Sequence, residues 1–170
     1  MARFRRFDTA RMATSALAPE RPPELDDVRL RRAGLKAAMS GLEISLAAPA
    51  PNRLDEWALG VADSLHVVHE VWTRHIVETE APGAFLDELI AESPRLATPA
   101  ARLRREHNEI LGVIARVEKA LTEIPVDTDP DVWCEQIRSE LTATLCALAR
   151  HRQRGADLIY EAYDVDVGGG

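Results

Sequence analysis

Three of the five histidines in this 170-residue chain occupy positions that a helical pattern directs toward a protein core. His75, His107 and His151 each lie on or beside a row of apolar residues spaced three or four apart. A buried imidazole costs free energy unless it finds a polar partner, and one shared cation meets that need for several imidazoles at once. Glu78 follows His75 by three residues, so both side chains project from nearly the same side of a helix. The pattern predicts a metal site made of these residues.

Counting residues along the predicted helices places the three histidines at similar depth. His75 lies about 8 Å from the end of its helix and His107 about 12 Å into the next, so antiparallel packing brings them within a turn of each other. His107 lies about 24 Å from the far end of that helix, and His151 lies about 30 Å from the start of the following helix, so these two histidines are also within about a turn of each other. We therefore expect three imidazoles in one layer. A lone histidine in a core row is more often a packing residue than a ligand, but the convergence of three favours a shared ion.

The other two histidines, His66 and His69, are predicted to lie outside this site. Their spacing of three residues is weak evidence for a metal site by itself, so we expect one on the surface and one at the edge of the core. The three tryptophans, Trp57, Trp72 and Trp133, are expected to fill the core.

Caps, helix breakers and apolar rows predict four long helices, with a short one between the second and the third. The long helices are expected to start at Asp26 or Asp27, at Asn52, at Thr98-Pro99 and at Asp129-Pro130, and the short helix to run from Ala84 to Glu92. Only 5% of the residues are aromatic, and Ala and Leu abound, which favours helices over sheets. Because short connections favour antiparallel neighbours, the predicted fold class is an all-α, up-down-up-down four-helix bundle.

The bundle is expected to be one domain, residues 26–165, with a flexible tail at 166–170. Residues 1–25 are predicted to be a flexible leader, and Met12 is an alternative start. The pair Arg5-Arg6 weakly resembles the start of a twin-arginine export signal. Asp8 and Arg11, however, interrupt the apolar stretch that such a signal needs, so we do not expect export.

Charge and composition exclude several classes of partner. The net charge is -7, and the chain offers no continuous basic face for nucleic acid. No apolar run approaches the roughly 18 residues of a membrane span. Cys134 and Cys146 are expected on one helix, roughly 18 Å apart, so they cannot bridge each other. Two unpaired thiols fit a reducing compartment, and we expect the protein in the cytoplasm.

Three segments of the chain resemble the hemerythrin family, also called the HHE cation-binding domain, and in particular a divergent actinobacterial branch of it. They are W-T-R-H-I-V-E-T-E at 72–80, R-E-H-N-E-I at 105–110 and A-R-H-R-Q-R-G-A-D-L-I-Y-E-A-Y at 149–163. The resemblance spans roughly residues 27 to 163. It implies four antiparallel helices whose inward histidines and carboxylates hold non-haem iron, with His75, His107 and His151 matching the family's histidines on the second, third and fourth helices.

The remaining family ligands are missing from the matching positions, which are Gly34 or Leu35 on the first helix, Thr79 on the second, Leu111 on the third, and Gly155 or Ala156 on the fourth. A complete di-iron site of the family uses five histidines and two bridging carboxylates. With three histidines and Glu78, the resemblance implies one iron ion rather than two, or zinc, with a position left for water or a small ligand. Glu106 and Glu109 flank His107 and are further candidate ligands if the helix is rotated.

The leading functional hypothesis is a cytoplasmic metal-binding protein that senses, buffers or redox-cycles with oxygen, peroxide or nitric oxide. The alternative is a metal-free helical scaffold or protein-interaction module that has lost the site, for which the missing ligands argue. No residue pattern nominates a general base or a substrate pocket, which favours a protein that is not an enzyme. A homo-oligomer is compatible with the sequence.

Overall fold

The computed structural model describes residues 23–123 and 128–164, with side-chain exposure from 33 to 123 and from 128 to 162. Within these ranges all regular structure is helical. The elements are α1 (Pro23–Ala47), α2 (Leu54–Glu80), the short α3 (Phe85–Glu92), a 3-10 turn (Pro94–Leu96), α4 (Ala97–Thr122) and α5 (Pro130–Asp164). The predicted tail 166–170 and residues 1–22 of the predicted leader lie outside the described residues.

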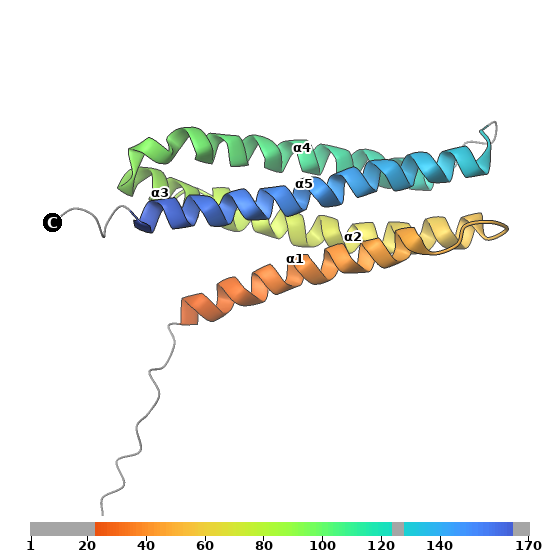
Figure 1. The fold of residues 1–170 in the computed structure, drawn as a ribbon, viewed down its shortest axis with the longest axis horizontal. Helices are drawn as coiled ribbons and strands as arrows, with labels where there is room; N and C mark the ends of the chain where they lie inside the picture. Colours follow the sequence, from red (N-terminus) through yellow and green to blue (C-terminus); the bar gives the residue numbers. More distant parts are fainter. Residues whose placement is uncertain (1–22, 124–127, 165–170) are drawn as a thin grey trace, which may run out of the picture.

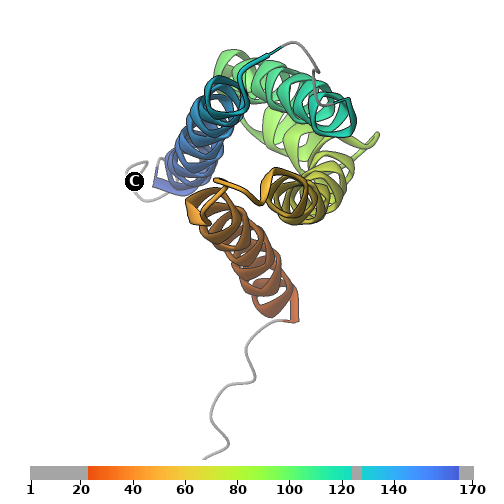
Figure 2. The ribbon, with the colours of Figure 1, turned by 90° about the vertical axis from the view of Figure 1, so that its right-hand side faces the viewer.

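Consecutive long helices run in opposite directions, and α3 crosses one end of the assembly (Figure 1). α2 packs against both α1 and α4, and α4 packs against α5. α1 contacts α5 much less, and it diverges from the other helices toward its N-terminal end (Figure 2). The all-α class and the antiparallel contacts predicted from the sequence are therefore confirmed, while α1 is held mainly by α2.

Apolar rows of the four long helices meet in one main core. The apolar spacing predicts a buried row from Trp57 to Ile76 in α2, from Leu103 to Leu121 in α4 and from Ile137 to Ala162 in α5. The residues of these rows are buried apart from Ile76, Gly155 and Ala162, which are partly exposed. The fully enclosed apolar side chains of the main core are Leu42, Val61, Leu65, Val68, Trp72, Ile114, Val117, Leu141 and Leu148. A smaller apolar cluster joins α3 and the 3-10 turn to the ends of α4 and α5, with Leu86, Leu96 and Leu158 at its centre.

Three of the predicted helix starts differ from the structure. α1 begins at Pro23, before the predicted Asp26 or Asp27, because proline suits the first turn of a helix. Asn52 does not cap α2, since it adopts a left-handed conformation with φ of 61° in the turn before Leu54. α4 begins at Ala97, so Thr98 lies inside the helix instead of capping it; the preceding 3-10 turn continues directly into α4.

The start of α5 agrees with the sequence, because the Asp129 carboxylate accepts a hydrogen bond from the backbone N–H of Asp131 at 2.9 Å. Arg138 of α5 supplies a cap that the sequence did not predict. Its guanidinium donates to the carbonyls of Leu46 and Ala48 at 3.0 Å each, at the C-terminal end of α1. These carbonyls have no partner within the helix, so the arginine satisfies them and ties α1 to α5.

Cys134 is buried and Cys146 is exposed, and both are free thiols on α5, as predicted. None of the helices in the described part of the chain is long and apolar enough to cross a membrane.

Candidate metal centre

The three histidines predicted to share a layer come from α2, α4 and α5. His107 lies between Leu103 and Ile110 on the buried face of α4, and His151 belongs to the buried row of α5. The helical spacing of these rows turns both imidazoles inward, where they are 1% and 3% exposed. His75, beside the buried row of α2, is partly buried. The layer separates the main core from the smaller cluster at α3, since Ile110 belongs to the first and Leu103 to the second.

The imidazole rings meet through their Nε2 atoms. Nε2 of His107 lies 3.1 Å from Nε2 of His151, which lies 3.3 Å from Nε2 of His75. Ligand atoms of all three residues lie within 4.8 Å of one another. These distances confirm that the three histidines share one layer.

Carboxylates hold the opposite ring nitrogens of two of these histidines. Glu80, the last residue of α2, contacts Nδ1 of His107, and Glu106 of α4 lies 3.2 Å from Nδ1 of His151. An ionised carboxylate only accepts hydrogen bonds, so each Nδ1 must donate its proton. Because a neutral imidazole carries one ring proton, Nε2 of His107 and Nε2 of His151 then face each other with lone pairs. Facing lone pairs repel unless a proton or a cation lies between them.

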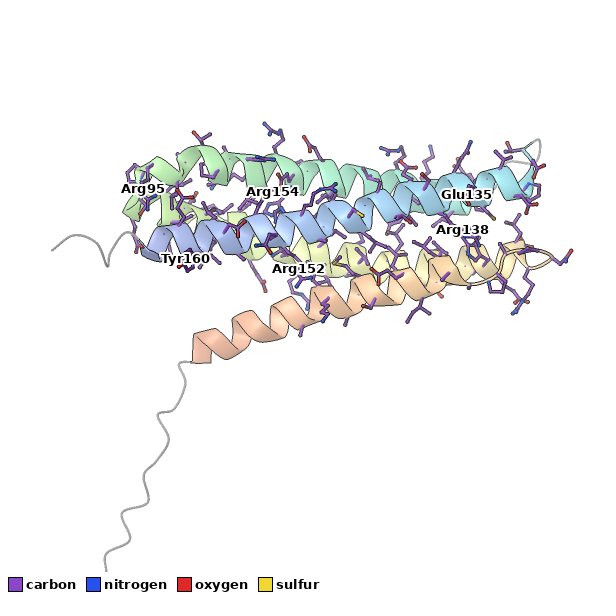
Figure 3. The ribbon with its side chains drawn as sticks, viewed as in Figure 1. Arg95, Glu135, Arg138, Arg152, Arg154 and Tyr160 are labelled. Carbon is purple, nitrogen blue, oxygen red and sulfur yellow. The ribbon has the colours of Figure 1, made fainter. Side chains whose placement is uncertain are left out.

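Two arginines fix the carboxylate of Glu106. Arg154 donates to Oε2 from Nε at 3.0 Å and from Nη2 at 2.8 Å, and Arg102 donates to Oε1 at 3.2 Å. Figure 3 shows Arg154 between α5 and α4. Burial raises the pKa of Glu106, but the hydrogen bonds from Arg154 and His151 outweigh this effect and leave the pKa below its ordinary value. The carboxylate is therefore ionised at neutral pH and oriented toward His151.

Trp72 packs against all three imidazoles from the side of the main core. Its ring stacks on His75 with centroids 5.1 Å apart, and it meets His107 and His151 edge to face at 5.3 and 4.9 Å. The indole Nε1 donates to the backbone carbonyl of His107 at 3.3 Å. Trp72 thus fills the core, as predicted, and also restricts the orientation of the three rings.

Burial lowers the pKa of each histidine in the layer. The pKa of His75 falls to about 3, through burial first and then the neighbouring His107 and His151. The pKa of His151 falls to about 4, because burial and His107 outweigh the opposing effect of Glu106. The pKa of His107 is also lowered by burial, although Glu80 opposes the shift. All three imidazoles are neutral around neutral pH, which is the form that binds metal ions.

The donor set and its spacing fit a single transition-metal ion. Nitrogens bound to one tetrahedral Zn²⁺ at about 2.0–2.1 Å lie about 3.3 Å apart, close to the 3.1 and 3.3 Å separations between these Nε2 atoms. The carboxylates of Glu80 and Glu106 behind the histidines match the arrangement that usually fixes the tautomer of metal-binding histidines. The triad of His75, His107 and His151 can therefore bind a metal ion.

Glu78 was predicted as a further ligand and is partly buried near the end of α2. Glu78 does not belong to the group of His75, His107 and His151, whose ligand atoms all lie within 4.8 Å of one another. Coordination of a metal ion by Glu78 therefore stays a prediction. Glu109 is exposed and pairs with Arg105 at 3.5 Å, which places it on the outer face of α4. Thr79, at the position where the hemerythrin family has a glutamate, donates its hydroxyl proton to the backbone carbonyl of His75 at 2.8 Å.

Glu80 and Glu106 were not predicted as hydrogen-bond partners of the histidine layer. The depth count that aligns His75 with His107 leaves the end of α2 about 12 Å from the level of His107, so it did not indicate that Glu80 would reach that ring. Glu106 was considered only as a ligand, whereas it binds Nδ1 of His151, the nitrogen that faces away from the other two imidazoles. Arg154 supports His151 indirectly, because it holds the carboxylate of Glu106.

No family model, curated protein or solved structure matched this chain. The resemblance to the hemerythrin family thus rests on the three sequence segments and on the histidine layer.

Proposed function

We propose that this protein binds one transition-metal ion in the interior of a hemerythrin-like up-down-up-down bundle, through Nε2 of His75, His107 and His151. The observation that carries the proposal is the convergence of these Nε2 atoms, with carboxylates on the opposite ring nitrogens of His107 and His151. A cation between the rings removes the repulsion of their lone pairs. The two carboxylates also offset its positive charge, which a buried ion requires.

One ion fits this layer better than the pair typical of the resembled family. The positions where that family has its remaining ligands hold Thr79, Leu111 and Gly155, which offer no imidazole or carboxylate. Leu111 packs against the main core instead. Three imidazoles leave at least one coordination position, which Glu78, water or an exogenous ligand would take.

Iron(II) is the ion that the family resemblance favours, and zinc is the alternative that the histidine donors also suit. A bound iron with an open position would supply reversible ligand binding or one-electron chemistry with oxygen, peroxide or nitric oxide. The protein's own residues would hold the ion, exclude other ligands and keep the imidazoles unprotonated. His75 is more exposed than the other two histidines, so we place the approach of a small ligand on its side of the layer. We propose binding, sensing or buffering in the cytoplasm rather than an enzymatic role.

Metal analysis of the full chain, purified without chelator or histidine tag, tests this function. We expect the replacement of His75, His107 and His151 by alanine to remove about one equivalent of iron or zinc from the metal content of the wild type. Asp63→Asn, which alters an exposed residue of α2, is the matched control. Circular dichroism of each variant checks that the helices remain. Equal metal content in the wild type and a folded triple variant would contradict the proposal.

The alternative is a metal-free scaffold or partner-binding module, and one observation favours it. The imidazoles already contact one another, their two carboxylates and Trp72, so they form a packed layer without an added ion. Wild-type protein in which neither Fe²⁺ nor Zn²⁺ binds to His75, His107 and His151 would support this alternative.

A further inference from the structure

A second cluster of metal-ligating side chains lies on the outside of the bundle, between α2 and α4. Nδ1 of His69 lies 2.9 and 2.8 Å from the two carboxylate oxygens of Glu118. Nδ1 of His66 lies 3.8 Å from the same carboxylate. One ligand atom from each of the three residues lies within 4.8 Å of the other two. The spacing of three residues between His66 and His69 turns both imidazoles toward Glu118.

We propose that His66, His69 and Glu118 form a second, solvent-exposed site for a divalent transition-metal ion, with zinc the ion best suited to it. Two imidazoles and one carboxylate are a ligand set that zinc accepts, and water would complete the coordination. The site does not depend on the proposed function of the histidine layer. The expectation that His66 and His69 lie outside any metal site is thereby revised. No local pattern in the sequence predicts that Glu118 of α4 faces them.

Glu70 supports the orientation of His66 that this site needs. Its carboxylate lies 3.7 Å from Nε2 of His66, one helical turn further along α2. With Nδ1 directed at Glu118 and Nε2 at Glu70, the ring has a carboxylate on each side. A metal ion at Nδ1 would leave Nε2–H facing Glu70, the same pattern of imidazole between ion and carboxylate that orients ligands in protein metal sites. Glu70 and Glu118 also concentrate negative charge beside two imidazoles, which attracts a cation.

The second site is separate from the histidine layer. His69 and His75 are six residues apart on α2, which is about 9 Å along the helix axis. Glu118 and His107 are eleven residues apart on α4, about 16 Å along its axis. The side chains of His66, His69 and Glu118 are 66%, 31% and 26% exposed, so the site is accessible and His66 can be changed without disturbing the core.

Titration of the metal-free full chain with Zn²⁺ alone tests the proposal. Calorimetry measures the zinc stoichiometry and affinity, and NMR spectra of the imidazole nitrogens show which histidines bind zinc. We expect zinc to shift the Nδ1 signals of His66 and His69 in the wild type. Glu118→Gln keeps a hydrogen-bond acceptor for His69 but removes the charged ligand, so it should lower zinc stoichiometry by one equivalent. His66→Ala should weaken zinc binding at this site by about tenfold or more.

Asp63→Asn provides the matched control, because it makes the same carboxylate-to-amide change at another exposed position of α2 and should leave zinc stoichiometry unchanged. Signals of His75, His107 and His151 report the buried layer independently, so failure of one site is distinguishable from failure of the other. Zinc that leaves the His66 and His69 signals unmoved, or moves them equally in Glu118→Gln, would overturn the second site.

Discussion

Nε2 of His107 lies 3.1 Å from Nε2 of His151, and a carboxylate holds the Nδ1 of each ring. The two carboxylates determine which ring nitrogen keeps its proton, and therefore which nitrogen can donate a lone pair to a metal. Glu80 and Glu106 come from different helices, α2 and α4, so the packing of the bundle sets the chemistry of the histidine layer.

Replacing Glu80 by glutamine should weaken metal binding by about 10- to 100-fold, because a neutral amide holds the Nδ1 proton of His107 less strongly and permits the other tautomer. The protein should remain folded, since Glu80 is partly exposed at the end of α2. Competition with a metal-binding dye measures the affinity.

Glu88→Gln, an exposed change on α3, is the control for this experiment. An affinity of Glu80→Gln equal to that of the control would show that the carboxylate does not govern the histidine tautomer.

Glu78→Gln tests the predicted fourth ligand in the same assay. If the Glu78 carboxylate coordinates the ion, its loss should weaken binding by about tenfold or more, comparable with the loss of an orienting carboxylate. The Glu80 variant serves as the reference for the size of the effect. Binding as tight as in the wild type would remove Glu78 from the ligand set and leave the three histidines as the protein ligands.

The lowered pKa values of the histidines should make the metal-free fold sensitive to acid. In the unfolded chain these imidazoles take up protons as the pH falls through about 6.5. In the folded protein His75 and His151 resist protonation until about pH 3 and about pH 4. Between these limits the unfolded state binds more protons, so the free energy of unfolding decreases as the pH falls, and it is unaffected by these groups above about pH 6.5.

Urea unfolding of chelator-treated protein at several pH values across this window measures the effect. His75→Gln should reduce the slope of stability against pH, whereas Val132→Ala, an uncharged change at an exposed position, should leave it unchanged. The same lowered pKa values mean that protons compete with a metal for these imidazoles at more acidic pH than for an ordinary histidine, whose pKa is about 6.5. Identical slopes in the two variants would contradict this account.

The sequence predicted much of the fold because helix periodicity and breakers are local signals. The apolar rows located the buried faces of α2, α4 and α5, and the count along them placed His75, His107 and His151 in one layer. Side-chain contacts between helices that are distant in the sequence could not be predicted in this way. Arg138 caps α1 from α5, and Glu118 meets His69 from α4; neither pairing leaves a local pattern in the sequence.

The divergence of α1 is a second feature that the sequence did not predict. Its apolar row, including Leu35, Leu42 and Leu46, lies in the core, as the spacing of three or four residues predicts. A row of apolar residues fixes which face is buried but not how far two helices separate along their length. The histidine layer is built from α2, α4 and α5, and the described part of α1 contributes no histidine to it.

Leu148 connects the stability of the bundle to the histidine layer. It is fully buried on α5, one turn before His151, and belongs to the main core. Leu148→Ala should lower the free energy of unfolding by about 2 to 5 kcal/mol, because it removes buried apolar contacts and leaves a cavity. Val132→Ala, on the same helix but exposed, is the control and should cost well under about 1 kcal/mol.

Urea unfolding in the presence of chelator separates this packing effect from any contribution of bound metal. A loss of less than about 1 kcal/mol for Leu148→Ala would show that the core near His151 rearranges to fill the cavity. In that event the position of the His151 ring would depend more on Glu106 and Trp72 than on the packing of α5, since those two side chains contact the imidazole directly.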